Sequence, residues 1–182
     1  MRRLAPLWPI ALVLASCAHA PAPPEQPAAG HGEAISLSGR VAVQQEKENF
    51  SGLFQWVSRD GVDDIQLSDP LGQGVAKIVR SARETSLQLP NGRTQTAPDA
   101  DALTEKLLGF RLPLAGMSYW MTARPDPARP HELTRDGQGR VERIVQDGWK
   151  IDYLSYVEGK PRKLYIMRPD LQIKLVVDHW GQ

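Results

Sequence analysis

The sequence predicts a mainly β fold of the α+β class: about eleven short antiparallel strands in an unclosed barrel, with a helical lid over an apolar cavity. Three observations lead to this prediction. Apolar and polar residues alternate along most of the chain after residue 35, helical spacing occurs in a central region, and most strands lack helical crossovers between them. About eight strands already close a barrel that side chains fill, so more strands leave room for a guest, although a sandwich is the alternative.

Five strands are predicted before the helical region. Phe54 and Trp56 fall on one face of the second strand, and Ile65 and Leu67 fall on one face of the third. The five strands cover residues 36–43, 50–57, 63–68, 73–80 and 85–90. An Asn-Gly-Arg sequence at 91–93 then signals a hairpin turn.

The hydrophobic period changes over two central segments, which are predicted to be helices. The first covers residues 98–110, with Asp99 as its N-cap and Gly109 as the residue that ends it. The second covers residues 112–123, begins with a proline near its first turn and places apolar residues at helical spacing. These two helices are the predicted lid.

Alternation returns after residue 130 and predicts five further strands. They cover residues 131–135, 140–147, 149–157, 161–168 and 171–180. Segments rich in glycine, proline and aspartate separate several of these strands, as expected for turns.

Motifs for catalysis are lacking. The chain has no G-x-S-x-G, Walker A or dinucleotide-binding pattern. Asp63 and Asp64 are adjacent in a strand and point to opposite faces, so a solvated turn edge is favoured over a pair of catalytic carboxylates. His131 and His179 are interpreted as structural, because no nucleophile lies near them in the pattern. The sequence therefore predicts no enzyme, and no cofactor or metal.

Residues 1–16 have the pattern of a secretory signal, with two arginines, an apolar stretch too short to span a bilayer and then small residues. The sequence Leu-Ala-Ser-Cys that ends at Cys17 resembles the bacterial lipobox. This resemblance implies cleavage before Cys17, diacylation of its thiol and acylation of the new amino group. An ordinary signal peptide with a chance cysteine is the alternative. Cys17 is the only cysteine, so it has no disulfide partner within the chain.

The expected organisation is an acylated cysteine with a flexible proline-rich tether at 17–35, followed by one domain at 36–182. Acyl chains would anchor the protein to a membrane that it does not span. Ala18 stands where bacterial lipoproteins retained in the inner membrane usually have an aspartate, which implies the outer membrane. Loss of residues 1–16 removes two arginines and no acid, so the formal charge falls from +1 to −1, which argues against a nucleic-acid partner.

The stretch LSDPLGQG, residues 67–74, places an apolar side chain at the tip of a tight turn. Asp69, Pro70 and Gly72 are turn-forming residues, and Leu71 lies between them where polar residues are usual. Leu71 either folds back onto the core or is exposed and contacts lipid. In the second case its burial would contribute about 1.5–3 kcal/mol, enough to bias a transient encounter but too little to anchor a protein.

Seven stretches, in order over about residues 36–179, resemble the LolB family: SGRVAV, FSGLFQW, DIQLSDPLGQ, DADALTEKLLGFRLPL, YWMTARPDP, QDGWKIDY and IKLVVDHW. The resemblance implies an unclosed antiparallel barrel with a helical lid. It also implies a monomeric outer-membrane receptor, facing the periplasm, that accepts lipoproteins from the carrier LolA and inserts them into the outer membrane. Leu71 matches the family's functional leucine, which implies membrane insertion. The family often has a helix before the first strand, where this chain has a proline-rich segment.

The acyl-binding cavity would be lined by apolar residues of the strands and the lid. The candidates are Phe54, Trp56, Ile65, Leu67, Leu107, Leu114, Met117, Trp120, Trp149 and Tyr153. Methionine and aromatic side chains suit an adaptable acyl site. Ordinary core packing is the alternative for each of them.

Three other functions compete with this interpretation. An anchored structural lipoprotein that binds peptidoglycan or an assembly partner would need no lipid cavity. A carrier of the LolA type would have to be soluble, and Cys17 argues against that. A lipid-cleaving enzyme would need a nucleophile pattern that the sequence lacks.

Overall fold

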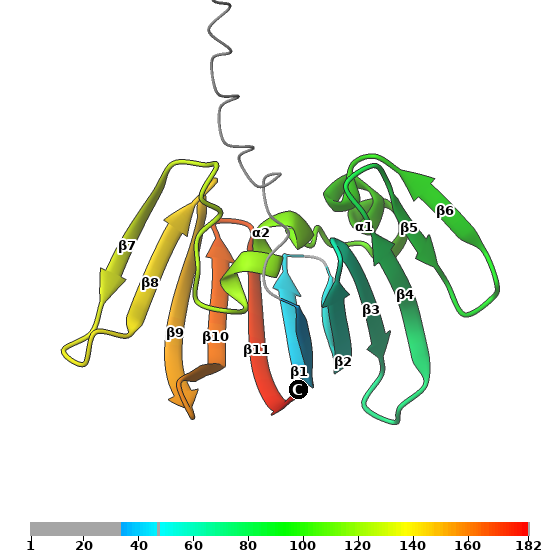
Figure 1. Cartoon of the computed structure of the whole chain (residues 1–182). Coiled ribbons are helices and arrows are strands. Elements are labelled where there is room, and N and C mark those ends of the chain that lie inside the picture. The colour runs from blue at the N-terminus through cyan, green and yellow to red at the C-terminus, as the bar shows by residue number, and fades with distance from the viewer. Residues whose placement is uncertain (1–33, 47, 182) are drawn as a thin grey trace, which may run out of the picture.

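The computed structural model describes residues 34–46 and 48–181, and shows one curved antiparallel sheet of eleven strands with two helices on its inner side (Figure 1). The strands are β1 Ile35–Gln45, β2 Asn49–Arg59, β3 Val62–Ser68, β4 Gly74–Arg80, β5 Thr85–Gln88, β6 Thr94–Ala97, β7 His131–Arg135, β8 Val141–Gln146, β9 Trp149–Val157, β10 Lys160–Arg168 and β11 Leu171–Trp180. The helices are α1 Ala100–Leu108 and α2 Leu114–Trp120.

The sheet is unclosed, as predicted. Its strand order is β6-β5-β4-β3-β2-β1-β11-β10-β9-β8-β7, so β6 and β7 form its two edges. The first and last strands pair at its centre, with Val41 opposite Leu175 and Val43 opposite Ile173. Both helices belong to the connection between the two edge strands, which crosses the inner side of the sheet. Within this connection, α1 contacts β5 and β6, whereas α2 lies on the inner side of the sheet near its centre.

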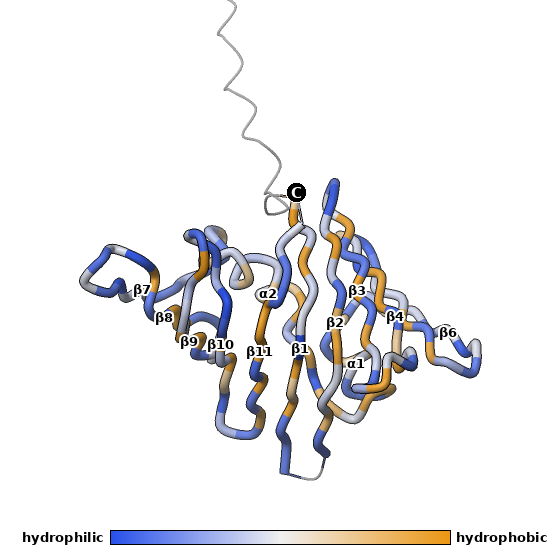
Figure 2. Tube along the Cα trace, turned by 90° about the horizontal axis from the view of Figure 1, so that it is seen from below, coloured by the Kyte–Doolittle hydropathy of each residue, from blue (hydrophilic) through white to orange (hydrophobic). Residues whose placement is uncertain are grey.

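Alternating burial explains why these segments are strands. Along β3, Asp63, Ile65 and Leu67 are buried while the residues between them are more exposed, and Figure 2 shows hydrophobic and hydrophilic positions alternating along the central strands. Strand β1 begins at Ile35, one residue before the predicted start of the domain, because Ile35 is itself buried. Strand β6 follows the predicted hairpin turn, but its sequence TQTA carries no apolar alternation by which to recognise it.

The predicted caps of α1 are present. The Asp99 carboxylate accepts hydrogen bonds from the backbone N–H groups of Asp101 and Ala102, at 2.9 and 3.1 Å. Gly109 ends the helix with a φ of 83°, and its N–H donates to the carbonyl of Glu105. Helix α2 is shorter than the predicted 112–123, because Pro113 precedes it and the chain turns after Trp120.

The interpretation of Asp63 as part of a solvated edge is wrong. Its side chain is only 2% exposed, because β3 directs Asp63 to the same inner face as Ile65. There Asp63 forms an ion pair with Arg80 and accepts a hydrogen bond of 3.1 Å from Trp56 Nε1. Asp64 points outward and forms an ion pair with Lys77 at 3.0 Å. A single inward carboxylate is compatible with the apolar face because it is paired there.

Replacing Gly116 in α2 by alanine is expected to destabilise the fold, although helix propensity alone would predict stabilisation. Alanine in a helix interior is normally about 0.5–1 kcal/mol better than glycine. A Cβ atom at Gly116, however, would lie 2.4 Å from a ring carbon of Trp120, which is fully buried. We expect Gly116→Ala to lower the free energy of unfolding by about 1–3 kcal/mol, measured by urea denaturation. The neighbouring Ala115→Gly should cost only the propensity difference, and a stabilised Gly116→Ala variant would contradict this packing.

Candidate functional site

An apolar cavity lies between the inner face of the central strands and the lid. Its volume is about 30 Å³. The strands β1, β2, β3 and β11, the helix α2 and the residues next to it supply the walls: Val41, Val43, Phe50, Phe54, Trp56, Ile65, Leu67, Phe110, Leu112, Leu114, Met117, Met121, Ile173 and Leu175. Every one of these side chains is hydrophobic. Phe110, which follows α1, stacks on Phe50 of β2 with ring centroids 5.7 Å apart and so ties the lid to the sheet.

Six of the ten residues proposed from the sequence line this cavity: Phe54, Trp56, Ile65, Leu67, Leu114 and Met117. The other four lie elsewhere. Trp120, Trp149 and Tyr153 are buried together where α2 meets β9, and Leu107 is only partly buried on α1. Periodicity identifies inward-facing residues, but it does not tell which part of a curved sheet lies under the lid.

Sequence reasoning missed the aliphatic wall of the cavity. Val43 in β1 and Ile173 in β11 are buried and line it, as do other residues of this strand pair. Both residues lie in predicted strands, at 36–43 and 171–180, but the pairing of the first strand with the last was not predicted. Met121 was also missed, although the helical spacing of the second predicted helix includes it.

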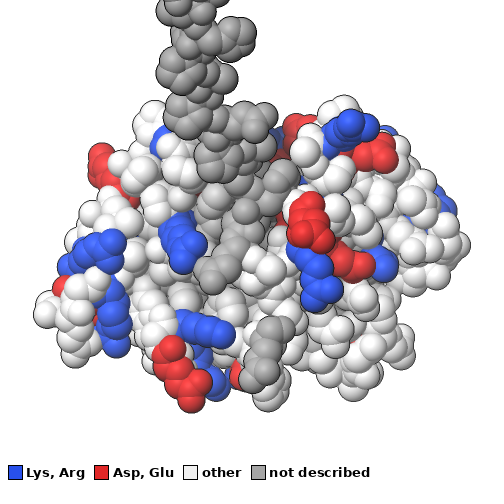
Figure 3. Space-filling view, in the orientation of Figure 1, with Lys and Arg blue, Asp and Glu red and all other residues white. Residues whose placement is uncertain are grey.

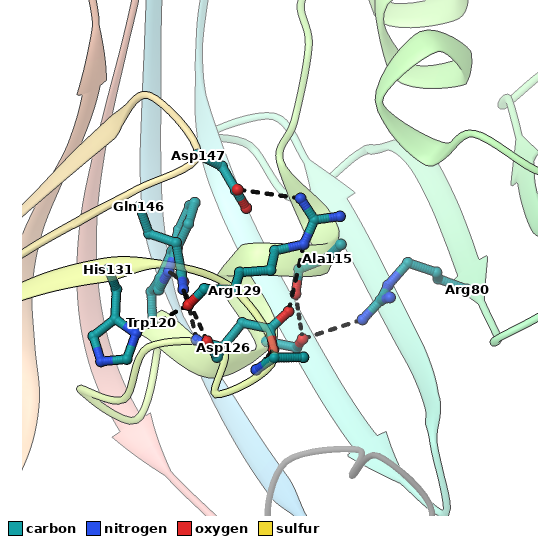
Figure 4. Close-up of polar contacts among 10 residues, drawn as sticks. Arg80, Ala115, Trp120, Asp126, Arg129, His131, Gln146 and Asp147 are labelled. Carbon is teal, nitrogen blue, oxygen red and sulfur yellow. Dashed lines mark hydrogen bonds and ion pairs between the residues drawn. The ribbon is translucent and has the colours of Figure 1, made fainter.

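Buried hydrogen bonds hold the C-terminal end of α2 against β8, as Figure 4 shows for Gln146, and against β9. The side-chain oxygen of Gln146 accepts from Trp120 Nε1 at 3.0 Å and from the backbone N–H of Asp126 at 2.9 Å. The Gln146 amide nitrogen donates back to the Asp126 carbonyl at 2.9 Å. Tyr153 donates its hydroxyl to the Trp120 carbonyl at 2.7 Å. Gln146 and Tyr153 therefore hold the C-terminal end of α2 in place.

Tyr153, which contacts this end of α2, and Tyr156, which stacks on Tyr153, are both protonated donors at neutral pH. Burial raises the pKa of the Tyr153 phenol far above its usual range, and Tyr156 contributes in the same direction. Burial also raises the pKa of Tyr156 to about 12. The Tyr156 hydroxyl donates to the Val141 carbonyl at 2.5 Å. Because both hydroxyls keep their protons, both hydrogen bonds persist over the physiological pH range.

A second set of polar contacts, made by Arg80, connects α2 to β4. Arg80 pairs with the buried carboxylate of Asp63. It also donates from Nη2 to the Ser118 hydroxyl of α2 at 3.2 Å (Figure 4). Trp56, which lines the cavity, donates to the same Asp63 carboxylate. Asp63 and Arg80 therefore lie next to the apolar wall, on the side of Trp56 where its Nε1 donates.

Leu71 lies at the tip of the turn between β3 and β4 and is 87% exposed. The Asp69 carboxylate accepts from the backbone N–H groups of Leu71 and Gln73, both at 2.9 Å. Gly72 adopts a φ of 88° and donates its N–H to the Asp69 carbonyl at 3.0 Å. This rigid turn directs Leu71 into solvent, so the interpretation in which Leu71 folds back onto the core is wrong.

The remaining sequence-based predictions fall on other parts of the chain. Cys17, predicted as the lipidation site, lies outside the described residues. His131 and His179 are both exposed, and His131 Nδ1 lies 3.1 Å from the Arg129 carbonyl. Over the ranges that the structure describes, the helices are too short or too polar to cross a membrane. Basic and acidic side chains are interspersed on the face seen in Figure 3.

Comparison with known proteins identifies the family. The family model described as outer membrane lipoprotein LolB matches residues 33–180. The chain belongs to the LolB family. The outer-membrane lipoprotein LolB of Thiobacillus denitrificans (strain ATCC 25259 / T1) is 47% identical over 99% of this chain and 98% of its own length. The LolB of Cupriavidus pinatubonensis (strain JMP 134 / LMG 1197) is 36% identical over 92% of this chain and 89% of its own.

Solved structures contain the same fold. The LolA superfamily protein NE2245 from Nitrosomonas europaea aligns with a TM-score of 0.51 over 82% of this chain and 86% of that protein. The sequence identity is only 9%, so this likeness concerns the fold alone. The mainly β, unclosed architecture predicted from the sequence is confirmed.

Proposed function

We propose that this chain is an outer-membrane lipoprotein receptor, which accepts lipoproteins from the periplasmic carrier LolA in its apolar cavity and inserts them into the outer membrane. The observation that carries this proposal is a wholly apolar cavity beneath a helical lid in a chain of the LolB family. The occupant is the acylated end of the cargo lipoprotein. No chemical reaction is needed, because cargo moves between three apolar environments: the carrier, the cavity and the bilayer.

The energetics of acyl chains explain why a cavity is needed. Burial of each methylene is worth about 0.8 kcal/mol, so exposing about three acyl chains to water would cost tens of kcal/mol. Direct transfer from the carrier's cavity to this one avoids that exposure. Because the chain has no nucleotide-binding motif, transfer depends on a difference in affinity, and the membrane provides the final sink.

The cavity must enlarge to receive cargo. A space of about 30 Å³ holds roughly one water molecule, far less than an acyl chain. Lid side chains therefore have to leave the inner face of the sheet. Met117 and Met121 of the lid are unbranched, flexible side chains that can repack around chains of different length.

Membrane attachment and delivery are assigned to two other parts of the chain. Cleavage before Cys17 and acylation of that residue would anchor the protein in the outer membrane, with the domain in the periplasm as a monomer. Leu71, exposed on its rigid turn, would enter the lipid surface and bring the cavity close to it. The LolA carrier is the proposed donor, and outer-membrane lipid is the proposed acceptor.

A transfer assay tests this proposal. A purified carrier loaded with a labelled lipoprotein is mixed with the chain lacking residues 1–17, with and without liposomes, and the label is followed. We expect the label to move to the chain without nucleotide, and then to liposomes when these are present. If the label stays on the carrier while the chain is folded, the receptor function is wrong. An anchored structural lipoprotein that binds peptidoglycan or a partner protein is then the better description.

A further inference from the structure

We propose that Arg80 is a binding subsite for the ester carbonyl groups at which the acyl chains of the cargo join their glycerol. This inference rests on the proposed function, and it concerns the polar part of a ligand whose apolar part the cavity would bury. The residues that carry it are Arg80, Asp63 and Ser118.

The apolar wall leaves the polar atoms of such a ligand without partners. All of the side chains that line the cavity are hydrophobic. An acylated glycerol, however, carries an ester carbonyl at the head of each chain, and burying a carbonyl without a hydrogen bond is costly. A donor at the edge of the cavity would remove that cost.

Arg80 is a donor whose two partners lie next to residues of the cavity wall. Its ion-pair partner Asp63 neighbours the cavity through Trp56, whose ring lines the cavity and whose Nε1 donates to Asp63. Its lid partner Ser118 follows Met117, which also lines the cavity. The Arg80 side chain is 19% exposed, so part of it already lies at the protein surface.

The hydrogen bonds of Arg80 are incompletely used. Its Nη2 atom serves both Asp63 and Ser118, while its Nε atom is buried and has no hydrogen-bond partner in the described part of the chain. An arginine offers five N–H donors in a planar fork. If the lid rises to admit acyl chains, Ser118 moves away with α2 and further donors of Arg80 face the opened cavity. Asp63 stays on the sheet and keeps the guanidinium in position.

The test compares two neutral lipids that differ only in their carbonyl groups. A short-chain 1,2-diacylglycerol and the 1,2-dialkylglycerol of equal chain length compete with a fluorescent apolar dye bound to the chain without residues 1–17. We expect the wild-type chain to bind the ester about tenfold more tightly than the ether, since a hydrogen bond from a charged donor is worth that ratio. Equal affinity for the two lipids would overturn the assignment of Arg80.

The variants separate Arg80 from general damage. Arg80→Met alone would leave Asp63 buried and unpaired, so it is combined with Asp63→Asn, which can still accept from Trp56. We expect this double variant to bind the ether as the wild type does and to lose its preference for the ester. Ser118→Ala keeps the Arg80–Asp63 pair and should keep the preference. A double variant that still prefers the ester, or a Ser118→Ala variant that does not, would contradict the proposal.

Two further outcomes have distinct meanings. If neither lipid displaces the dye from the wild-type chain, the acyl-binding cavity itself is wrong and the ester subsite falls with it. A fatty acid of matched length tests whether Arg80 binds a free carboxylate instead of an ester carbonyl. If its affinity depends on Arg80 more strongly than that of the ester, the subsite binds free fatty acids and the ester assignment is overturned.

Discussion

Replacing Leu71 by glutamate is expected to leave acceptance of cargo unchanged and to abolish its delivery to a membrane. Leu71 is outside the cavity and points into solvent from a turn held by Asp69, so the change should not disturb the fold or the acyl site. Burying a leucine in lipid gains about 1.5–3 kcal/mol, whereas a charged carboxylate opposes entry into the hydrocarbon. The two halves of the transfer assay, carrier to chain and chain to liposomes, measure the two steps separately.

Leu154 provides a matched control for this experiment. It is also a large apolar residue exposed to solvent, at 55%, but it lies within β9 instead of at the tip of a turn. Leu154→Glu should therefore transfer and deliver cargo as the wild type does. Loss of acceptance together with delivery in Leu71→Glu would show that Leu71 does more than contact the membrane. Equal defects in both variants would show that any added surface charge is enough.

Replacing Gln146 by leucine is expected to lower the free energy of unfolding by about 2–4 kcal/mol. The change removes the acceptor for Trp120 Nε1 and for the Asp126 N–H, and the donor to the Asp126 carbonyl. A buried polar group that loses its partner costs about 1–3 kcal/mol, and Gln146 and Trp120 are both buried. Urea denaturation followed by tryptophan fluorescence would measure the loss.

The control is the same glutamine-to-leucine replacement at an exposed position. Gln138 lies exposed in the turn between β7 and β8, so Gln138→Leu should alter stability by less than about 0.5 kcal/mol. If Gln146→Leu is equally mild, the hydrogen bonds that hold the end of α2 contribute little. The lid would then be held mainly by apolar packing, such as that of Trp120 against Trp149.

Local chemistry allowed most of the fold to be predicted. Alternation in β3 and the capping residues Asp99 and Gly109 depend on neighbours in sequence, and the structure contains these features as expected. The pairing of β1 with β11 joins residues separated by most of the chain, and no local pattern encodes it. That pairing supplies Val43 and Ile173 to the cavity, so the site was predicted less completely than the strands that form it.

The polar residues were harder to interpret. Asp63 resembles a surface residue because aspartates usually are exposed, and its burial depends on Arg80 in the neighbouring strand and on Trp56 in the strand before it. Leu71 departs from the usual pattern in the opposite way, as an apolar residue that remains exposed. Both residues depart from their usual environment, and both enter the proposals: Leu71 contacts the membrane, and Asp63 positions Arg80.

The direction of the strands sets a requirement on length. Leu37 pairs with Trp180, so the described chain begins and ends at the same end of the sheet, while β3 runs parallel to β1 and carries its turn with Leu71 to the opposite end. The eleven residues of β1 span about 36 Å. Residues 18–34, if fully extended, reach at most about 60 Å. If the chain is anchored at Cys17, as proposed, this length lets Leu71 reach the membrane that holds the anchor, whereas a tether shorter than the sheet would keep Leu71 away from the lipid.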